Sequence, residues 1–146
     1  MNILNLRNNK GFTLIELMVV IGIIAILATV VLVAVNPLRQ FQSARDSQRR
    51  SDLYAVTNTV YQYAVENNGN LPAGIPTGEA SAVDIGTGGA NLTADLVPTY
   101  IADIPVDPLN GTPATAGYTI FQTAAGRVVA SGSSELNAGA YISVER

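Results

Sequence analysis

Lys10-Gly11-Phe12-Thr13-Leu14-Ile15-Glu16-Leu17 opens an apolar stretch that continues to Val35. The segment from Phe12 to Val35 has one ionisable side chain, that of Glu16. About 20 consecutive apolar residues are enough for a helix to cross the hydrocarbon core of a bilayer. The sequence therefore predicts a membrane-spanning helix over residues 12–36, preceded by a short basic segment that contains Arg7 and Lys10.

The order of these segments differs from that of an ordinary secretory signal, in which the apolar core comes before the cleavage site. Here the apolar stretch follows Gly11, and a basic leader, Gly11 and Phe12-Thr13-Leu14-Ile15-Glu16 come in succession. This pattern resembles the type IV pilins and the type II secretion pseudopilins. The resemblance implies that a prepilin peptidase removes residues 1–11 by cutting between Gly11 and Phe12 on the cytoplasmic side, and that Phe12 is then N-methylated. The alternative is an N-terminal anchor that is not cleaved.

Glu16 is the unusual residue of the apolar segment. A charged side chain at the centre of a bilayer costs on the order of 2.5 to 3.5 kcal/mol, and somewhat less near the interface. The resemblance implies that Glu16 pairs with the free amine of Phe12 in a neighbouring subunit during filament assembly. The alternative is that Glu16 interacts with the N-terminal end of its own helix, where the helix dipole favours negative charge.

The helix is expected to continue beyond the membrane, over residues 37–68, as an amphipathic segment. Gly22 and Pro37 weaken the backbone hydrogen bonding where they fall, and the resemblance implies that such soft spots let the helix stretch when subunits enter a fibre. Asn67, Asn68 and Gly69 form a signal for the end of the helix. Apolar residues recur at helical spacing on one face, which should be buried: Leu53, Val56, Val60 and Ala64.

Charged residues are unevenly distributed after the apolar stretch. Four arginines come first, close to Asp46 and Asp52: Arg39, Arg45, Arg49 and Arg50. Either they form solvated pairs along the helix, Arg50 with Asp46 and Arg49 with Asp52, or Arg39, Arg45 and Arg49 contact lipid headgroups or acidic neighbours. From Leu53 onward the chain has eight acidic residues and two arginines, so its net charge there is minus six. Such a surface repels phosphate backbones, which argues against nucleic-acid binding by this part of the chain.

Residues 69–146 are expected to form a globular head. The stretch from Ala73 to Asn91 is rich in small residues and predicts a surface loop, with a helical turn near Leu96. Three runs typical of strands follow, at residues 118–122, 127–130 and 140–144. They predict a three-stranded antiparallel sheet with Tyr118, Phe121 and Tyr141 in the core. The expected fold is α+β, a lollipop in which the long N-terminal helix packs against this small C-terminal sheet.

The composition also restricts the chemistry. The chain has no His and no Cys, so the usual zinc sites, Ser-His-Asp triads and Cys-His dyads are not available. We therefore expect a protein that is not an enzyme and that has no cofactor. In some proteins that this chain resembles, loop acids bind calcium. Asp103, Asp107 and Asn110 are weak candidates for such ligands, because they lack the spacing of a defined calcium loop and such residues more often form turns.

The resemblance implies a structural subunit that polymerises into a helical surface filament for adhesion, motility or DNA uptake. Its partners would be other copies of the chain, the prepilin peptidase and the assembly machinery of the inner membrane. It would be a single-pass protein of the bacterial cytoplasmic membrane, and later part of an extracellular or periplasmic filament. The alternatives are a pseudopilin of a type II secretion system, and a single-span membrane protein whose external head binds a ligand without polymerising.

Overall fold

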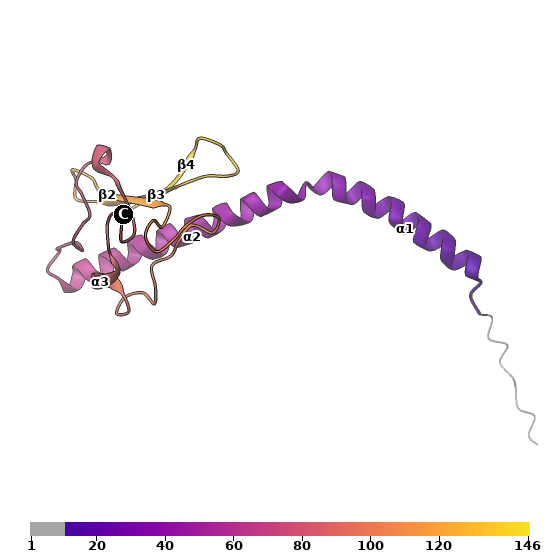
Figure 1. Cartoon of the computed structure of the whole chain (residues 1–146), viewed down its shortest axis with the longest axis horizontal. Coiled ribbons are helices and arrows are strands. Elements are labelled where there is room, and N and C mark those ends of the chain that lie inside the picture. Colours follow the sequence, from indigo (N-terminus) through magenta and orange to yellow (C-terminus); the bar gives the residue numbers. More distant parts are fainter. Residues whose placement is uncertain (1–10) are drawn as a thin grey trace, which may run out of the picture. The chain divides into compact units, whose positions relative to one another are not determined.

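The computed structural model describes residues 11–146 of the chain. The expected leader peptide, except Gly11, lies outside the described residues, together with Arg7 and Lys10. The chain divides between Leu38 and Arg39 into two compact units. Figure 1 shows the elements of both: helix α1 in the first, and most of helix α2, the short helix α3 and the strands in the second.

Helix α1 (Leu14–Val35) is built almost entirely from apolar residues. Its 22 residues give a length of about 33 Å at 1.5 Å per residue, which matches a hydrocarbon core of about 30 Å. None of its residues is buried against the described part of the chain. By length and composition α1 is a helix that can cross a membrane.

The helical part is interrupted at Asn36. This residue is left-handed, with φ 46° and ψ 81°, and Asn tolerates that region better than most residues. Pro37 then begins α2 (Pro37–Glu66), a position where its missing N–H costs no helical hydrogen bond. The structure therefore has two successive helices in place of the single uninterrupted one that we expected, because a proline disfavours the helical conformation of the residue before it.

Helix α2 buries the face that its periodicity predicts. Leu53, Val56 and Val60 are completely buried, and Ala64 is nearly so. The helix ends at Glu66, after which the Gly69 N–H donates to the Ala64 carbonyl at 2.8 Å. This hydrogen bond closes the helix with a left-handed turn.

The sheet has four antiparallel strands in sequence order. They are β1 (Val83–Asp84), β2 (Tyr118–Gln122), β3 (Val128–Ser133) and β4 (Tyr141–Glu145). Three of the strands confirm the predicted runs, whereas β1 lies in the segment that we predicted as loop, as does the short 3-10 helix Glu79–Ser81. Strand β1 is only two residues long and exists through its pairing with distant residues of β2, Val83 opposite Ile120. Local periodicity carries no signal for such a strand.

The core of the head lies between α2 and the sheet. The α2 face packs in one cluster with alternating residues of the strands and with residues near α3 (Thr93–Leu96). Tyr118 and Phe121 are buried as expected, but the prediction for Tyr141 is wrong, because its side chain is 76% exposed. In β4 the alternation places Ile142 and Val144 toward the core, so Tyr141 points to the other face.

Candidate functional site

The segment before α1 presents the predicted cleavage point openly. Gly11 and Phe12 are in irregular backbone and are exposed, and the Phe12 side chain is 91% exposed. Apart from Gly11 itself and its neighbours in the chain, no atom of the described residues lies within 4 Å of the position that a Cβ would take at Gly11. A peptide bond in exposed, irregular backbone can enter a protease cleft, and the absent side chain of Gly11 leaves room for close approach.

Thr13 and Glu16 form a capping box at the start of α1. The Glu16 carboxylate oxygen Oε2 accepts hydrogen bonds from the Thr13 N–H at 2.8 Å and from the Thr13 hydroxyl at 2.7 Å. The Glu16 N–H in turn donates to Thr13 Oγ1 at 3.2 Å. The sequence analysis did not name Thr13, although Thr-x-x-Glu at the start of an apolar helix is a recognisable signal for this cap.

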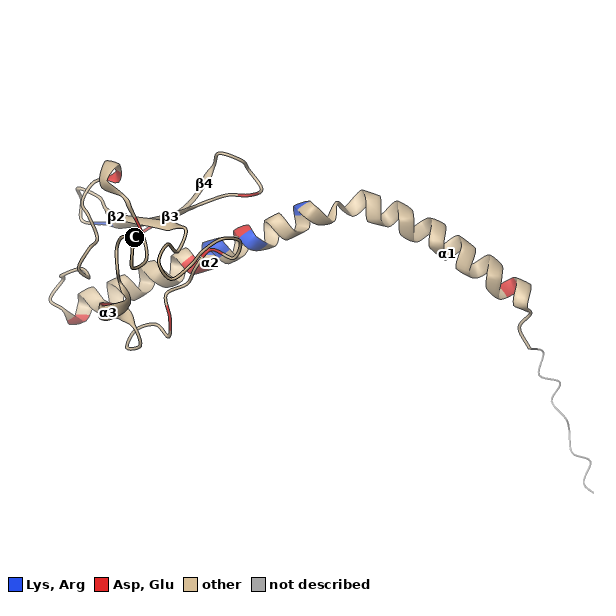
Figure 2. Ribbon diagram, viewed as in Figure 1, with Lys and Arg blue, Asp and Glu red and all other residues tan. Residues whose placement is uncertain are grey.

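The second oxygen of Glu16 is chemically available. Both hydrogen bonds to the carboxylate reach Oε2, and within residues 11–146 Oε1 accepts none. Glu16 lies among exposed apolar side chains, and Figure 2 shows it as the single acidic residue of α1. Phe12, Ile15, Val19 and Val20 form an open hollow with it. A carboxylate in this setting can accept a hydrogen bond from a cation while it keeps its cap.

Two further residues of the prediction have defined positions. Gly22 lies inside α1 without interrupting it, and a Cβ at Gly22 would meet none of the described residues within 4 Å. Pro37 is the first residue of α2. The helical interruption thus coincides with Pro37 and the preceding Asn36, and the role of both soft spots in a fibre stays a prediction.

A buried cluster of charges in the head is the main feature that the sequence did not predict. The side chain of Arg49, on α2, is 2% exposed. Its guanidinium contacts Asp107 at 2.5 Å, Glu135 at 2.6 Å and Asp46 at 2.8 Å. Neighbouring Arg45 forms a second ion pair with Glu135, at 2.5 Å. Of the readings left open for these arginines, the structure shows Arg45 and Arg49 contacting acidic neighbours in the same head.

Two carboxylates of this cluster, those of Asp46 and Asp107, also accept hydrogen bonds from uncharged groups, whereas Glu135 contacts Arg45 and Arg49. Asp46 accepts from the Ser134 hydroxyl and from the N–H groups of Glu135 and Leu136. Burial alone would raise the pKa of Asp46, but these hydrogen bonds and the one from Arg49 lower it to about 2. The pKa of Asp107 is lowered too, because the hydrogen bonds from Arg49 and from the turn backbone outweigh its burial. The cluster is therefore held in its charged form by several donors per carboxylate.

The weak calcium candidates Asp103, Asp107 and Asn110 are not arranged like the ligands of a cation site. Asp107 is occupied by Arg49, and its Oδ1 accepts hydrogen bonds from the N–H groups of Leu109 and Asn110. Asp103 accepts from the N–H of Ile104. These are turn contacts, and residues 11–146 contain no group of three or more acidic side chains placed to hold a metal ion.

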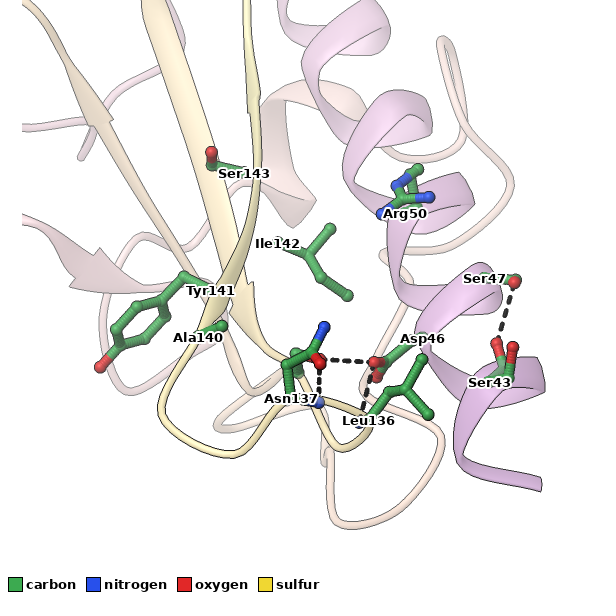
Figure 3. Close-up of a pocket in the computed structure, with 11 residues that line it drawn as sticks. Ser43, Asp46, Ser47, Arg50, Leu136, Asn137, Ala140, Tyr141, Ile142 and Ser143 are labelled. Carbon is green, nitrogen blue, oxygen red and sulfur yellow. Dashed lines mark hydrogen bonds between the residues drawn. The ribbon is translucent and has the colours of Figure 1, made fainter. Parts of the chain in front are cut away.

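A polar groove lies between α2 and the edge strand β4 (Figure 3). It measures about 390 Å³, and we call it the β4 groove. Arg50 faces it from α2, and Ile142 faces it from β4, as Figure 3 shows. Its other lining residues are mostly small or polar, among them Ser43, Ser47, Asn137 and Ser143.

Comparisons with known proteins agree with the N-terminal geometry. Residues 6–32 match the family described as "Prokaryotic N-terminal methylation motif". Over 62 residues the chain is 40% identical to the type II secretion system core protein G of Aeromonas hydrophila. These 62 residues are 42% of this chain and 42% of that protein. No solved structure matches the chain. The matched family segment contains Gly11, Phe12 and Glu16, together with most of α1.

The buried charge cluster leads to a prediction about stability. Removing the guanidinium in Arg49→Ala leaves three carboxylates without their shared partner, and we expect the free energy of unfolding to fall by about 3 to 5 kcal/mol. The matched control is Arg127→Ala, because Arg127 pairs with Glu145 at 3.3 Å on the exposed surface and its loss should cost about 0 to 1 kcal/mol. Urea unfolding of the full chain in detergent, followed by near-UV circular dichroism, measures both. Equal small losses would contradict a structural role for Arg49.

The same cluster predicts sensitivity to acid. The pKa of Asp46 is lowered in the folded head from an ordinary value of 3.8 to about 2, so the folded state binds fewer protons than the unfolded state between these values. The resulting stabilisation is complete above about pH 4 and is lost as the pH falls toward about 2. Urea midpoints measured in steps from pH 6 to pH 2 should therefore decrease mainly below about pH 4. Asp46→Asn should flatten that decrease, and an unchanged pH profile in this variant would contradict the assignment.

Proposed function

We propose that this chain, a member of the type IV pilin and type II secretion pseudopilin family, is processed before Phe12 and polymerises with its own copies into a helical filament. The observation that carries the proposal is the capping box of Glu16, in which one carboxylate oxygen is held by Thr13 and the other is open. Glu16 lies at the start of an apolar helix. There the open carboxylate oxygen can receive the new N-terminal ammonium of a neighbouring copy.

The first step is the release of an amine. Cleavage of the exposed Gly11–Phe12 bond leaves Phe12 as the N-terminal residue, with a positive charge close to neutral pH. That charge and Glu16 then lie at the same end of α1, so each copy carries both members of an ion pair. A pair formed between copies neutralises two charges that are costly in an apolar surrounding and fixes how far one helix is shifted along its neighbour.

The second step is the covering of α1. None of its residues is buried within the described chain, so either lipid or other copies of α1 must surround it. Contact between different surfaces of identical chains does not close on itself and produces an open helical assembly. Lipid before assembly and neighbouring helices after it provide similar apolar surroundings, which allows the chain to exchange one for the other.

The third point concerns the role of the filament. A surface filament for adhesion, motility or DNA uptake is our first assignment. The partial identity to a type II secretion core protein supports the second candidate, a secretion pseudopilus. In both roles the protein starts as a single-pass protein of the cytoplasmic membrane and depends on a prepilin peptidase and on inner-membrane assembly proteins. Both comparisons point to a structural protein and not to an enzyme.

Substitution of Glu16 tests the proposal. Glu16→Gln keeps the size and an acceptor for Thr13 but removes the charge, so we expect a processed membrane protein whose filament yield falls by on the order of tenfold or more, because the ion pair between copies is lost. Sheared filaments and membranes from native cells, quantified by immunoblot, measure the yield. The matched control is Glu79→Gln, which removes an exposed carboxylate of the head and should leave the yield unchanged. Wild-type yield from Glu16→Gln would contradict the proposal.

A further inference from the structure

The outer edge of β4 has free backbone groups. Strand β4 is the last of the sheet and pairs only with β3 among the described strands. Backbone hydrogen bonds identify the bonded pairs of the ladder between β3 and β4. Val128 and Arg146 exchange two hydrogen bonds, and the Ser134 N–H donates to the Ala140 carbonyl. Bonded and non-bonded pairs alternate in an antiparallel ladder, so the N–H and C=O groups of Tyr141, Ser143 and Glu145 point away from β3. This edge can accept another extended segment.

The two faces of β4 offer different chemistry to such a segment. On the α2 side is the β4 groove with Arg50, whose side chain forms no ion pair or hydrogen bond within the described chain, unlike Arg45 and Arg49. On the other side the ring of Tyr141 points away from the groove, as Figure 3 shows, and is 76% exposed. A strand added at this edge sends alternate side chains to the two faces, so an acidic residue next to an apolar one would meet Arg50 and Tyr141.

The head itself contains a candidate segment outside its helices and strands, residues 101–106, in which a bend at Ala102 and Asp103 is followed by irregular backbone that includes Pro105. Asp103 is exposed and Ile104 follows it. The other acids of the head that lack a cation lie in regular elements, Asp52 and Glu66 in α2, Glu79 in a 3-10 helix, Asp84 in β1 and Asp95 in α3. The N–H groups of Ala102, Asp103 and Val106 donate no hydrogen bond within residues 11–146, so this segment also has free backbone donors. Beside Ile104 and Val106 lies a pocket of about 140 Å³ with an apolar wall.

Within one head, no hydrogen bond or ion pair of the described residues joins residues 101–106 to the residues that line the β4 groove, although the next residue, Asp107, pairs with Arg49 of α2. The 140 Å³ pocket includes Ile85, which directly follows β1, whereas the groove lies at β4. Strands β1 and β4 are the opposite edges of the sheet. A contact between the two surfaces therefore joins two copies, uses a different surface on each, and can repeat without closing.

We propose that the β4 groove of one copy binds residues 101–106 of the next copy, with Arg50 paired to Asp103 and Tyr141 packed against Ile104 and its pocket. This inference rests on the proposed function, because it requires copies of the chain to be neighbours in a filament. It assigns the heads a contact of their own, in addition to the contact between the α1 helices. The ion pair supplies orientation, and the buried Tyr141 ring supplies apolar contact area.

A charge exchange in the full chain tests the ion pair. Arg50→Glu and Asp103→Arg, expressed singly in native cells, should each lower the amount of sheared filament while the membrane pool and its protease resistance stay at wild-type levels. The double variant Arg50→Glu/Asp103→Arg restores the opposite charges and should regain filaments. The matched control is Arg50→Glu/Glu79→Arg, which has the same net charge but the wrong partner and should stay low. Recovery in both double variants, or in neither, overturns the proposed pair.

Disulfide crosslinking provides a second measurement that does not depend on assembly yield. The chain has no Cys, so every disulfide between copies of the chain must come from the introduced cysteines. In filaments, the double variant Ser47→Cys/Asp103→Cys should give a ladder of dimers, trimers and longer products on oxidation, because Ser47 lines the β4 groove together with Arg50 and each copy uses two different surfaces. Each single variant should give at most dimers. Filaments that form without a ladder overturn the head contact and leave the proposed function standing, whereas wild-type protein absent from filaments refutes the proposed function.

Discussion

The burial of one guanidinium is the constraint on which the head depends. Arg49 joins α2 to the turn at Asp107 and to the loop at Glu135, segments that are 58 and 86 residues further along the chain. A buried cation is costly unless it is fully paired, so the turn and the loop have to be in place when α2 docks. The chain has no Cys, and the ionic cluster joins these distant segments without a disulfide.

The sequence predicts those features that depend on local pattern. The apolar run gives α1, the helical spacing of Leu53, Val56 and Val60 gives the buried face of α2, and alternation gives three of the strands. It does not predict β1, the pairing of Arg49 with Asp107 and Glu135, or the exposure of Tyr141, because each depends on residues distant in the chain. The interruption at Asn36 is predicted in part. The sequence identifies Pro37 as a position that weakens the helix, whereas only the backbone geometry shows that the first helix ends at Val35.

The N-terminal site shows what geometry adds to a motif. Gly11, Phe12 and Glu16 are identified by sequence pattern alone. The structure adds that Thr13 holds one oxygen of Glu16 and leaves the other open, which reconciles the two roles considered for this residue. Glu16 can stabilise the start of its own helix and still receive a cation from another copy. In the proposed function, lipid covers the apolar surface of α1 first and neighbouring helices cover it later.

In the proposed function, processing at Phe12 is the event from which the amine, its pairing with Glu16 and filament growth all follow. The most direct measurement is the N-terminal residue and the intact mass of the protein in filaments sheared from native cells. The account predicts a chain that begins at Phe12 and carries one additional methyl group. A chain in the membrane that still begins at Met1, together with filaments that lack the protein, would contradict it.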